Sequence, residues 1–227
     1  DLSNINDLDN NDDEFLGKLK SNTPPKHRPL DVKVVVGKCN VQLLLLKTIN
    51  EIVNQYYDCM NTEHFDLILD ALNENYILAK KLNNTQSVWR ATGKSEIMSL
   101  IIKQESISCK GYLDLLFKLY ADDDNSKQDF ARDKLLERIS ELMREYINVN
   151  DQPDKYPTVY AESKIPILLC AIEGFYKFEE SLFIKHLPEL YDYLCDLILM
   201  NEKMVRDKVQ AILTRVGSVH KFVPIKS

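Results

Sequence analysis

The stretch CNVQLLLLKTINEIVNQYY, residues 39–57, is the longest run in the chain whose apolar residues keep one helical period. Apolar or weakly polar side chains recur every three or four residues along it, which is typical of one face of an α-helix. That face consists of Val41, Leu44, Leu45, Thr48, Ile49, Ile52, Val53 and Tyr56. Leu43 and Leu46 lie off this face and give the helix a second apolar side. We therefore expect a core helix between two neighbours, with Leu45 buried.

The composition is that of an ordinary globular protein, with 227 residues of which 44% are hydrophobic and 28% charged. A net charge of -6 argues against a general nucleic-acid binder, because neutralising phosphates requires a basic field. The five cysteines are odd in number and far apart, which indicates reduced, buried thiols in a cytosolic protein. No stretch approaches the ~18 consecutive apolar residues of a membrane span.

Residues 1–30 are expected to form a disordered linker. Residues 1–14 carry six acidic and no basic side chains, with too few apolar residues to build a core. Residues 15–38 reverse the sign, with six Lys or Arg against one Asp, and contain three prolines. The alternative interpretation of this basic segment is a tether that touches an anionic membrane. A helical domain is then expected over residues 31–217, and a flexible tail over residues 218–227.

Further amphipathic helices, joined by short connections, follow the first one. The first of them are expected over residues 62–82, over residues 86–92, from Ser95 onward with a break near Ser108, and after a cap at Ser126. Three more are expected: one with Pro166 in its first turn, one that begins at Pro188, and one over residues 201–216. Outside residues 32–38, no useful length alternates with the period of a strand. The predicted fold class is therefore all-α. It consists of stacked antiparallel helical hairpins, a HEAT/armadillo-like α-solenoid without a visible sequence repeat.

The sequence contains few candidates for catalytic or metal-binding residues. The four histidines lack the spacing of metal ligands, and no glycine-rich phosphate loop, nucleophile elbow or HExxH pattern occurs, so no cofactor and no metal are expected. Asp122, Asp123 and Asp124 could serve a divalent metal in an all-helical enzyme domain. No second acidic motif faces them, and a solvated loop between two helices is the favoured interpretation.

Four residues are candidates for a partner surface. Trp89 and Arg90 are either an exposed recognition pair or, as we favour, a Trp that fills the gap between two hairpins beside an Arg that bonds a helix end. Ile167 and Cys170 add apolar width to the helix that contains Pro166. We expect a surface of the C-terminal hairpins to be covered by a second copy or by a neighbouring domain.

Short blocks of the chain resemble, in the same order, the C-terminal regulatory region of a known family. They are CNVQLLLL at 39–46 with INE at 49–51, AKKLN at 79–83, WRATG at 89–93, Leu100 with KQE at 103–105, LLFKLY at 115–120, HLPELY at 186–191 and RVG at 215–217. Together they are similar to the large brefeldin-A-inhibited guanine nucleotide exchange proteins, the Sec-seven type activators of Arf GTPases at the trans-Golgi. Gly37, Thr92 and the loop at 121–129 depart from the family pattern and affect local surfaces.

The resemblance implies the last of the helical domains that follow the catalytic exchange domain. The family's catalytic glutamate finger and Arf-binding groove have no counterpart here, so it implies that this segment is not an enzyme. It implies a noncatalytic regulatory and interaction module in Golgi vesicle trafficking, which controls membrane recruitment, autoregulation or assembly of the exchange factor. The implied partners are small GTPases of the Arf, Arl or Rab type, other domains of the same protein, a second copy as a homodimer, and the Golgi membrane, but no nucleic acid. The implied location is cytoplasmic and peripheral at the trans-Golgi network.

Overall fold

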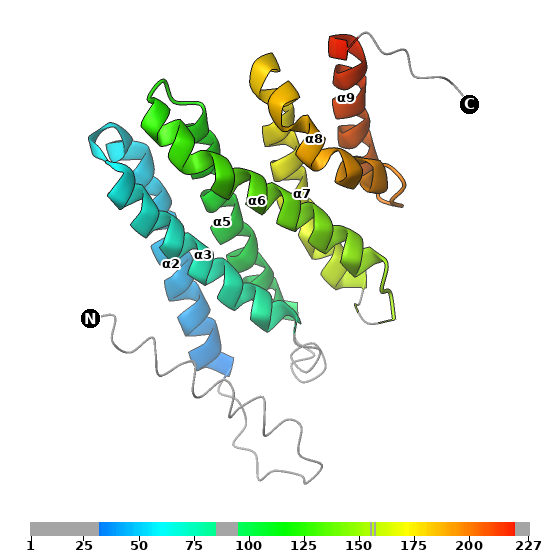
Figure 1. The fold of residues 1–227 in the computed structure, drawn as a ribbon. Coiled ribbons are helices and arrows are strands. Elements are labelled where there is room, and N and C mark those ends of the chain that lie inside the picture. The colour runs from blue at the N-terminus through cyan, green and yellow to red at the C-terminus, as the bar shows by residue number, and fades with distance from the viewer. Residues whose placement is uncertain (1–31, 85–94, 155, 157, 221–227) are drawn as a thin grey trace.

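The computed structural model describes residues 32–84, 95–154, 156 and 158–220, and the regular structure in this part of the chain is helical throughout. The elements are α2 (Val32–Tyr56), the 3₁₀ turn η2 (Tyr57–Cys59), α3 (Thr62–Asn84), α5 (Ser95–Tyr120), α6 (Asn125–Asn150), α7 (Thr158–Tyr176), α8 (Glu180–Leu197) and α9 (Lys203–His220). Consecutive helices alternate in direction and stack from α2 at one end to α9 at the other (Figure 1). The predicted all-α fold of stacked hairpins is confirmed.

Two helices hold the stack together. The helices α2, α3, α6 and α7 all pack against α5, whose Leu113, Leu116 and Leu119 are fully buried. In turn α7 contacts α6 and α9 as well as α5. This position explains the apolar width of α7 noted in the sequence, because Ile167 and Ala171 are buried in the core of the molecule itself.

The first helix buries a different side from the one predicted, and of the eight residues on the predicted face only Val53 is buried. Its buried residues are Cys39, Leu43, Leu46 and Val53, followed by Tyr57 of η2. The exposed large apolar residues are Val41 (59%), Leu44 (65%), Leu45 (57%), Ile52 (42%) and Tyr56 (54%). The expectation that Leu45 is buried is therefore wrong. Gly111 of α5 is one reason, because a Cβ there would lie 2.7 Å from Oδ1 of Asn50. The glycine lets α5 approach the shorter apolar side of α2 closely.

The helix α5 is continuous, so the break predicted near Ser108 is wrong. The Ser108 hydroxyl bonds inside the helix, with its Oγ 2.7 Å from the Gln104 carbonyl and 3.1 Å from the Glu105 carbonyl. Such a local bond satisfies the hydroxyl without ending the helix. Ser108 and the nearby Gln104 and Glu105 are buried because α5 passes through the centre of the molecule.

Several helix ends also differ from the prediction. Pro166 lies inside α7 and Pro188 inside α8, where the sequence had suggested a first turn and a start. Both prolines are exposed, which places the interrupted backbone bonding on the solvent side of each helix. The N-cap of α6 is Asp124 and not Ser126, since the Asp124 carboxylate accepts a hydrogen bond from the Ser126 N–H. The last helix continues through Gly217 to its end at His220.

Some expectations concern segments outside the described residues. These are the linker at 1–30, the short helix at 86–92 with Trp89 and Arg90, and residues 221–227 of the tail.

Candidate functional site

An open groove of about 720 Å³ lies between α5 and α7, bordered by the α5–α6 loop and the α7–α8 turn. Phe117, Leu169, Cys170, Phe178 and Leu182 give it an apolar floor. Phe117 and Phe178 meet edge to face with their ring centroids 5.7 Å apart. A Cβ at Gly174 of α7 would overlap the Phe117 ring, so the absence of a side chain there lets the two helices close the bottom of the groove.

The rim of the groove carries ion pairs of both signs. Lys110 and Asp114 of α5 pair at 2.6 Å, and Glu173 of α7 pairs with Lys177 at 3.1 Å and with Lys208 of α9 at 3.4 Å. These groups are exposed, so each pair contributes at most about 1 kcal/mol and rearranges easily. An apolar floor inside such a rim suits an apolar side chain on a partner helix or loop.

Cys170 lies in the groove with its side chain half-buried. Burial, and then the nearby Asp114 carboxylate, raise the pKa of its thiol, so the sulfur stays protonated at neutral pH and is a poor nucleophile. Of the other candidates for a partner surface, Ile167 is 3% exposed and packs in the core, while Trp89 and Arg90 lie outside the described residues. Among these four residues, only Cys170 is placed in the groove.

The aspartate cluster forms the loop between α5 and α6. Asp122 accepts hydrogen bonds from the Tyr57 hydroxyl (2.8 Å), the Lys127 ammonium (3.0 Å) and the Asp124 N–H (3.0 Å). Its carboxylate thereby ties the loop to η2 and to the first turn of α6. Within the described ranges, no group of three or more His, Cys, Asp or Glu side chains is placed to hold a metal ion. The carboxylate that a metal-dependent enzyme would use has a structural role here.

Acid titration should reveal this role. The Asp124 N–H, together with Lys127 and Tyr57, lowers the pKa of Asp122 from 3.8 to about 2. A carboxylate with a depressed folded-state pKa stabilises the fold above its unfolded pKa, and this stabilisation is lost as the pH falls through the folded pKa. We therefore expect Asp122→Asn to be less stable than the wild type at pH 7, by a margin that shrinks between pH 4 and pH 2. Urea unfolding measures the margin, with Asp123→Asn as control. A margin independent of pH would contradict the assignment.

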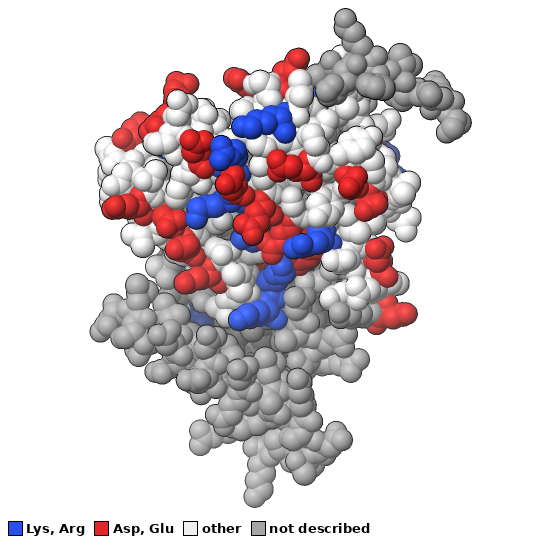
Figure 2. Space-filling view, in the orientation of Figure 1, with Lys and Arg blue, Asp and Glu red and all other residues white. Residues whose placement is uncertain are grey.

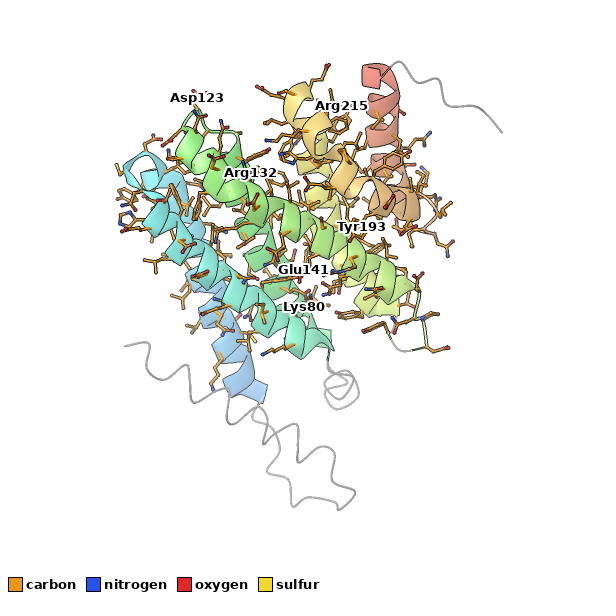
Figure 3. The ribbon with its side chains drawn as sticks, viewed as in Figure 1. Lys80, Asp123, Arg132, Glu141, Tyr193 and Arg215 are labelled. Atoms are coloured by element: carbon orange, nitrogen blue, oxygen red, sulfur yellow. The ribbon has the colours of Figure 1, made fainter. Side chains whose placement is uncertain are left out.

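A second polar cluster runs from the surface into the core where α3, α5, α6 and α7 meet, with Lys80 and Glu141 partly exposed and Lys164 and Glu105 buried. Lys164 of α7 pairs with Glu105 of α5 and lies 3.1 Å from Glu145 of α6. Glu145 is also 2.6 Å from Lys80 of α3, which approaches Glu141 at 3.5 Å. Lys80 and Glu141 lie close together across the α3–α6 contact (Figure 3). These ion pairs connect four helices, α3, α5, α6 and α7.

Arg138 of α6 completes this cluster. Its guanidinium lies between the rings of Tyr76 and Tyr112, 4.9 and 4.7 Å from their centroids, and bonds the Asn73 side chain. It also pairs with Glu141 at 3.3 Å. We call the three cations and three anions together the ionic layer. Its members are Lys80, Glu105, Arg138, Glu141, Glu145 and Lys164.

The electrostatics of the ionic layer are those of a structural element. Burial favours the protonated form of Glu145, but Lys164 and Lys80 outweigh it and hold the pKa of Glu145 below its ordinary value. A general acid or base would instead have its pKa moved towards the working pH. Glu145 is therefore ionised at neutral pH and is not poised to act as a general acid.

The sequence analysis did not identify the ionic layer, although a signal was present. Glu105 stands four residues from both Ile101 and Cys109, which are buried on the same face of α5. Lys164 stands four residues before the buried Leu168. A charge at helical spacing within a buried stripe indicates a buried partner of opposite sign.

The outer surface bears on two other kinds of binding, to nucleic acid and to a membrane. On the face seen in Figure 2, acidic and basic side chains are interspersed, so this face lacks the uniform basic field that phosphate binding requires. Among the described helices, none combines the length and the apolar content needed to cross a membrane.

Comparison with known proteins gives a consistent set of relatives. The family model described as the BIG2 C-terminal domain matches residues 40–214. The human Brefeldin A-inhibited guanine nucleotide-exchange protein 1 is 22% identical over 249 residues, covering 92% of this chain and 13% of the relative. The Arabidopsis thaliana Brefeldin A-inhibited guanine nucleotide-exchange protein 3 is 22% identical over 218 residues, covering 87% of this chain and 12% of the relative.

A yeast protein extends this set. The Saccharomyces cerevisiae ADP-ribosylation factor guanine nucleotide-exchange factor SEC7 is 24% identical over 123 residues, covering 52% of this chain and 6% of the relative. The chain thus spans at most 13% of the length of these three relatives. No solved structure matches the chain significantly.

Proposed function

The chain belongs to the BIG2 C-terminal domain family, and from this membership we propose that it is a noncatalytic regulatory and interaction module of an Arf guanine nucleotide exchange factor. The relatives are named as guanine nucleotide-exchange proteins of the brefeldin-A-inhibited and ADP-ribosylation factor types. The module acts in Golgi vesicle trafficking, where it controls membrane recruitment, autoregulation or assembly of the exchange factor. Its place is the cytoplasmic side of the trans-Golgi network, peripheral to the membrane.

The observation that supports an interaction role is the groove between α5 and α7. It offers an apolar floor to a partner side chain and charges of both signs to the residues around that side chain. Two titratable groups of the groove are unsuited to catalysis, because burial keeps Cys170 protonated and the Asp122 carboxylate is engaged by Tyr57 of η2 and Lys127 of α6. The proposed occupants are small GTPases of the Arf, Arl or Rab type, or another domain of the same exchange factor.

Two measurements on the purified chain test the proposal. In the first, Arf loaded with a fluorescent GDP analogue is mixed with the chain in Mg²⁺ buffer, and we expect nucleotide release at the intrinsic rate. Faster release caused by the chain alone would overturn the noncatalytic assignment. In the second, Arf-, Arl- and Rab-type GTPases loaded with GDP or a GTP analogue are titrated onto the immobilised chain. We expect at least one of them to bind in one nucleotide state.

A pair of variants locates the contact. Cys170→Arg places a large cation in the groove and should weaken GTPase binding at least 10-fold. Cys195→Arg makes the same change at a half-buried cysteine of α8 that does not line the groove, and should leave binding unchanged. Urea unfolding confirms that both variants are folded. Equal loss in the two variants would exclude the groove, and lack of binding by every GTPase would exclude this partner class.

A further inference from the structure

Two carboxylates at one end of the α5–α7 groove have no partner in the part of the chain that the structure describes. They are Asp123 of the α5–α6 loop and Glu179 of the α7–α8 turn, which are exposed and line the groove. Tyr120 at the end of α5 and Phe178 just after α7 have ring centroids 5.0 Å apart. The loop and the turn that follow these two helices therefore lie at the same end of the groove.

These two carboxylates are the excess negative charge of the groove. Its other acidic lining residues already have cation partners, because Asp114 and Glu173 pair with Lys110 and Lys177, and Asp122 pairs with Lys127. An occupant that joins apolar side chains to positive charge would therefore complement both the floor and this end of the groove.

The last helix ends beside the same end of the groove. Arg215 of α9 bonds the Tyr176 carbonyl and lies 2.6 Å from the carbonyl of Phe178, whose side chain forms part of the groove floor. Asp123 and Arg215 lie towards the same end of the stack (Figure 3). From Arg215 the helix continues to His220, over about 7.5 Å at a rise of about 1.5 Å per residue.

The chain beyond His220 has the chemistry that the groove calls for. We call residues 221–227, with the sequence KFVPIKS, the C-terminal segment. It contains no acidic residue, and its apolar and basic side chains are Phe222, Val223, Ile225, Lys221 and Lys226. Seven extended residues span up to about 23 Å. The segment is thus long enough to turn back past Arg215, reach the floor at Phe178 and continue along the groove.

We propose that the C-terminal segment folds back into the α5–α7 groove of its own chain. Phe222 packs on the aromatic floor, where it can meet the rings of Phe117 and Phe178 edge to face. The two lysines of the segment lie near the unpaired carboxylates. Pro224 fixes its own φ angle and favours an extended backbone at the residue before it, which reduces the entropy lost on binding in an extended form.

The consequence for regulation rests on the proposed function. A segment tethered next to its site has an effective concentration on the order of millimolar, so even a weak contact keeps the groove occupied. The C-terminal segment then competes with the GTPase for the groove. A GTPase binds only after it displaces the segment, and its apparent affinity is lower by the fraction of chains whose groove is free.

The accessibility of Cys170 tests the contact without any GTPase. The full chain at 1 µM is treated with N-ethylmaleimide at pH 8, and mass spectrometry of peptides gives the rate of modification at each cysteine. Phe222→Asp should raise the rate at Cys170 at least about 5-fold, because it frees the groove. The rate at Cys195, which is half-buried on α8 outside the groove, should not change. Met204→Asp, at a 58% exposed residue of α9, is the matched control and should behave as the wild type does.

Three results would overturn the proposal. The first is an equal rate at Cys170 in the wild type and in Phe222→Asp. The second is a rise at Cys195 as large as the rise at Cys170, which would indicate loosening of the fold. The third is protection of Cys170 that grows with protein concentration from 1 to 50 µM, which would show that the segment of another molecule occupies the groove. Urea unfolding verifies that each variant is folded.

Charge reversal tests where the lysines lie. A variant with Lys221→Glu and Lys226→Glu should lose most of the protection of Cys170, and so should one with Asp123→Lys and Glu179→Lys. The variant with all four changes should regain it, because opposite charges then meet again. Failure to regain protection would overturn this placement of the segment.

The regulatory role has its own measurement. For a GTPase that binds the chain, Phe222→Asp should tighten binding at least about 3-fold, while Met204→Asp should leave it unchanged. Equal affinity of Phe222→Asp and the wild type would overturn the competition. Lack of binding by every GTPase would contradict the proposed function alone, since the protection of Cys170 is measured without a GTPase.

Discussion

Replacing Lys164 with methionine is expected to lower the free energy of unfolding by about 3–5 kcal/mol, the largest effect anticipated for a single polar substitution in this protein. Methionine has a similar length and leaves no large cavity. The loss comes from the carboxylates, because Glu105 is 2% exposed and keeps its burial when its cation is removed. Urea unfolding at pH 7 measures the change.

Two further variants show whether charge is the cause. Lys177→Met removes an exposed cation paired with Glu173 and should cost less than about 1 kcal/mol. The double variant Lys164→Met, Glu105→Gln removes charge from both partners and should be more stable than Lys164→Met alone, with Lys80 still neutralising Glu145. A Lys164→Met protein within 1 kcal/mol of the wild type would show that the buried pair does not form.

The neighbouring leucines Leu45 and Leu46 are expected to respond very differently to truncation. Leu46 is fully buried against the core, so Leu46→Ala should cost about 2–5 kcal/mol through lost burial and the cavity left behind. Leu45 is 57% exposed, so Leu45→Ala should cost no more than about 0.5 kcal/mol. Urea unfolding measures both changes. The reverse order of stabilities would show that α2 is rotated by half a turn.

This pair of residues also shows what the sequence can and cannot decide. Periodicity correctly located α2 and revealed apolar residues on two of its sides. Choosing the buried side requires knowing which neighbour docks there, and α5 docks where Gly111 meets Asn50. The longer stripe was the more conspicuous one, and it proved to be exposed. Counting apolar residues cannot distinguish a face covered within the chain from one left for a partner.

Predictions made from local sequence were wrong where tertiary packing determined the structure. Ser108 and its polar neighbours suggested a break, but Lys164, which lies 59 residues from Glu105 in sequence, supplies the partner that makes a buried Glu tolerable. Pro166 and Pro188 suggested helix starts, and each instead lies on the exposed side of a continuing helix. For Glu105 the deciding neighbour is remote in sequence.

The groove could be predicted only in small part. Cys170 was recognised as extra apolar surface on its helix, whereas the floor depends on Phe117 and Phe178, which stand on different elements and meet only in the folded chain. The lack of a side chain at Gly174, which sets how closely α5 and α7 approach, carries no signal in a periodicity analysis. Family resemblance located the domain, whereas the groove became visible only in the structure.

The ionic layer also bears on folding fidelity. Helices with plain leucine faces can slide past one another, since one apolar contact replaces another at small cost. Sliding α7 by one turn along α5 would displace Lys164 by about 5.4 Å and strand at least two charges in the interior. A misaligned stack is therefore less stable than the native one, because it leaves buried charges without partners. The ionic layer therefore favours a single mutual register of α3, α5, α6 and α7, four helices from distant parts of the chain.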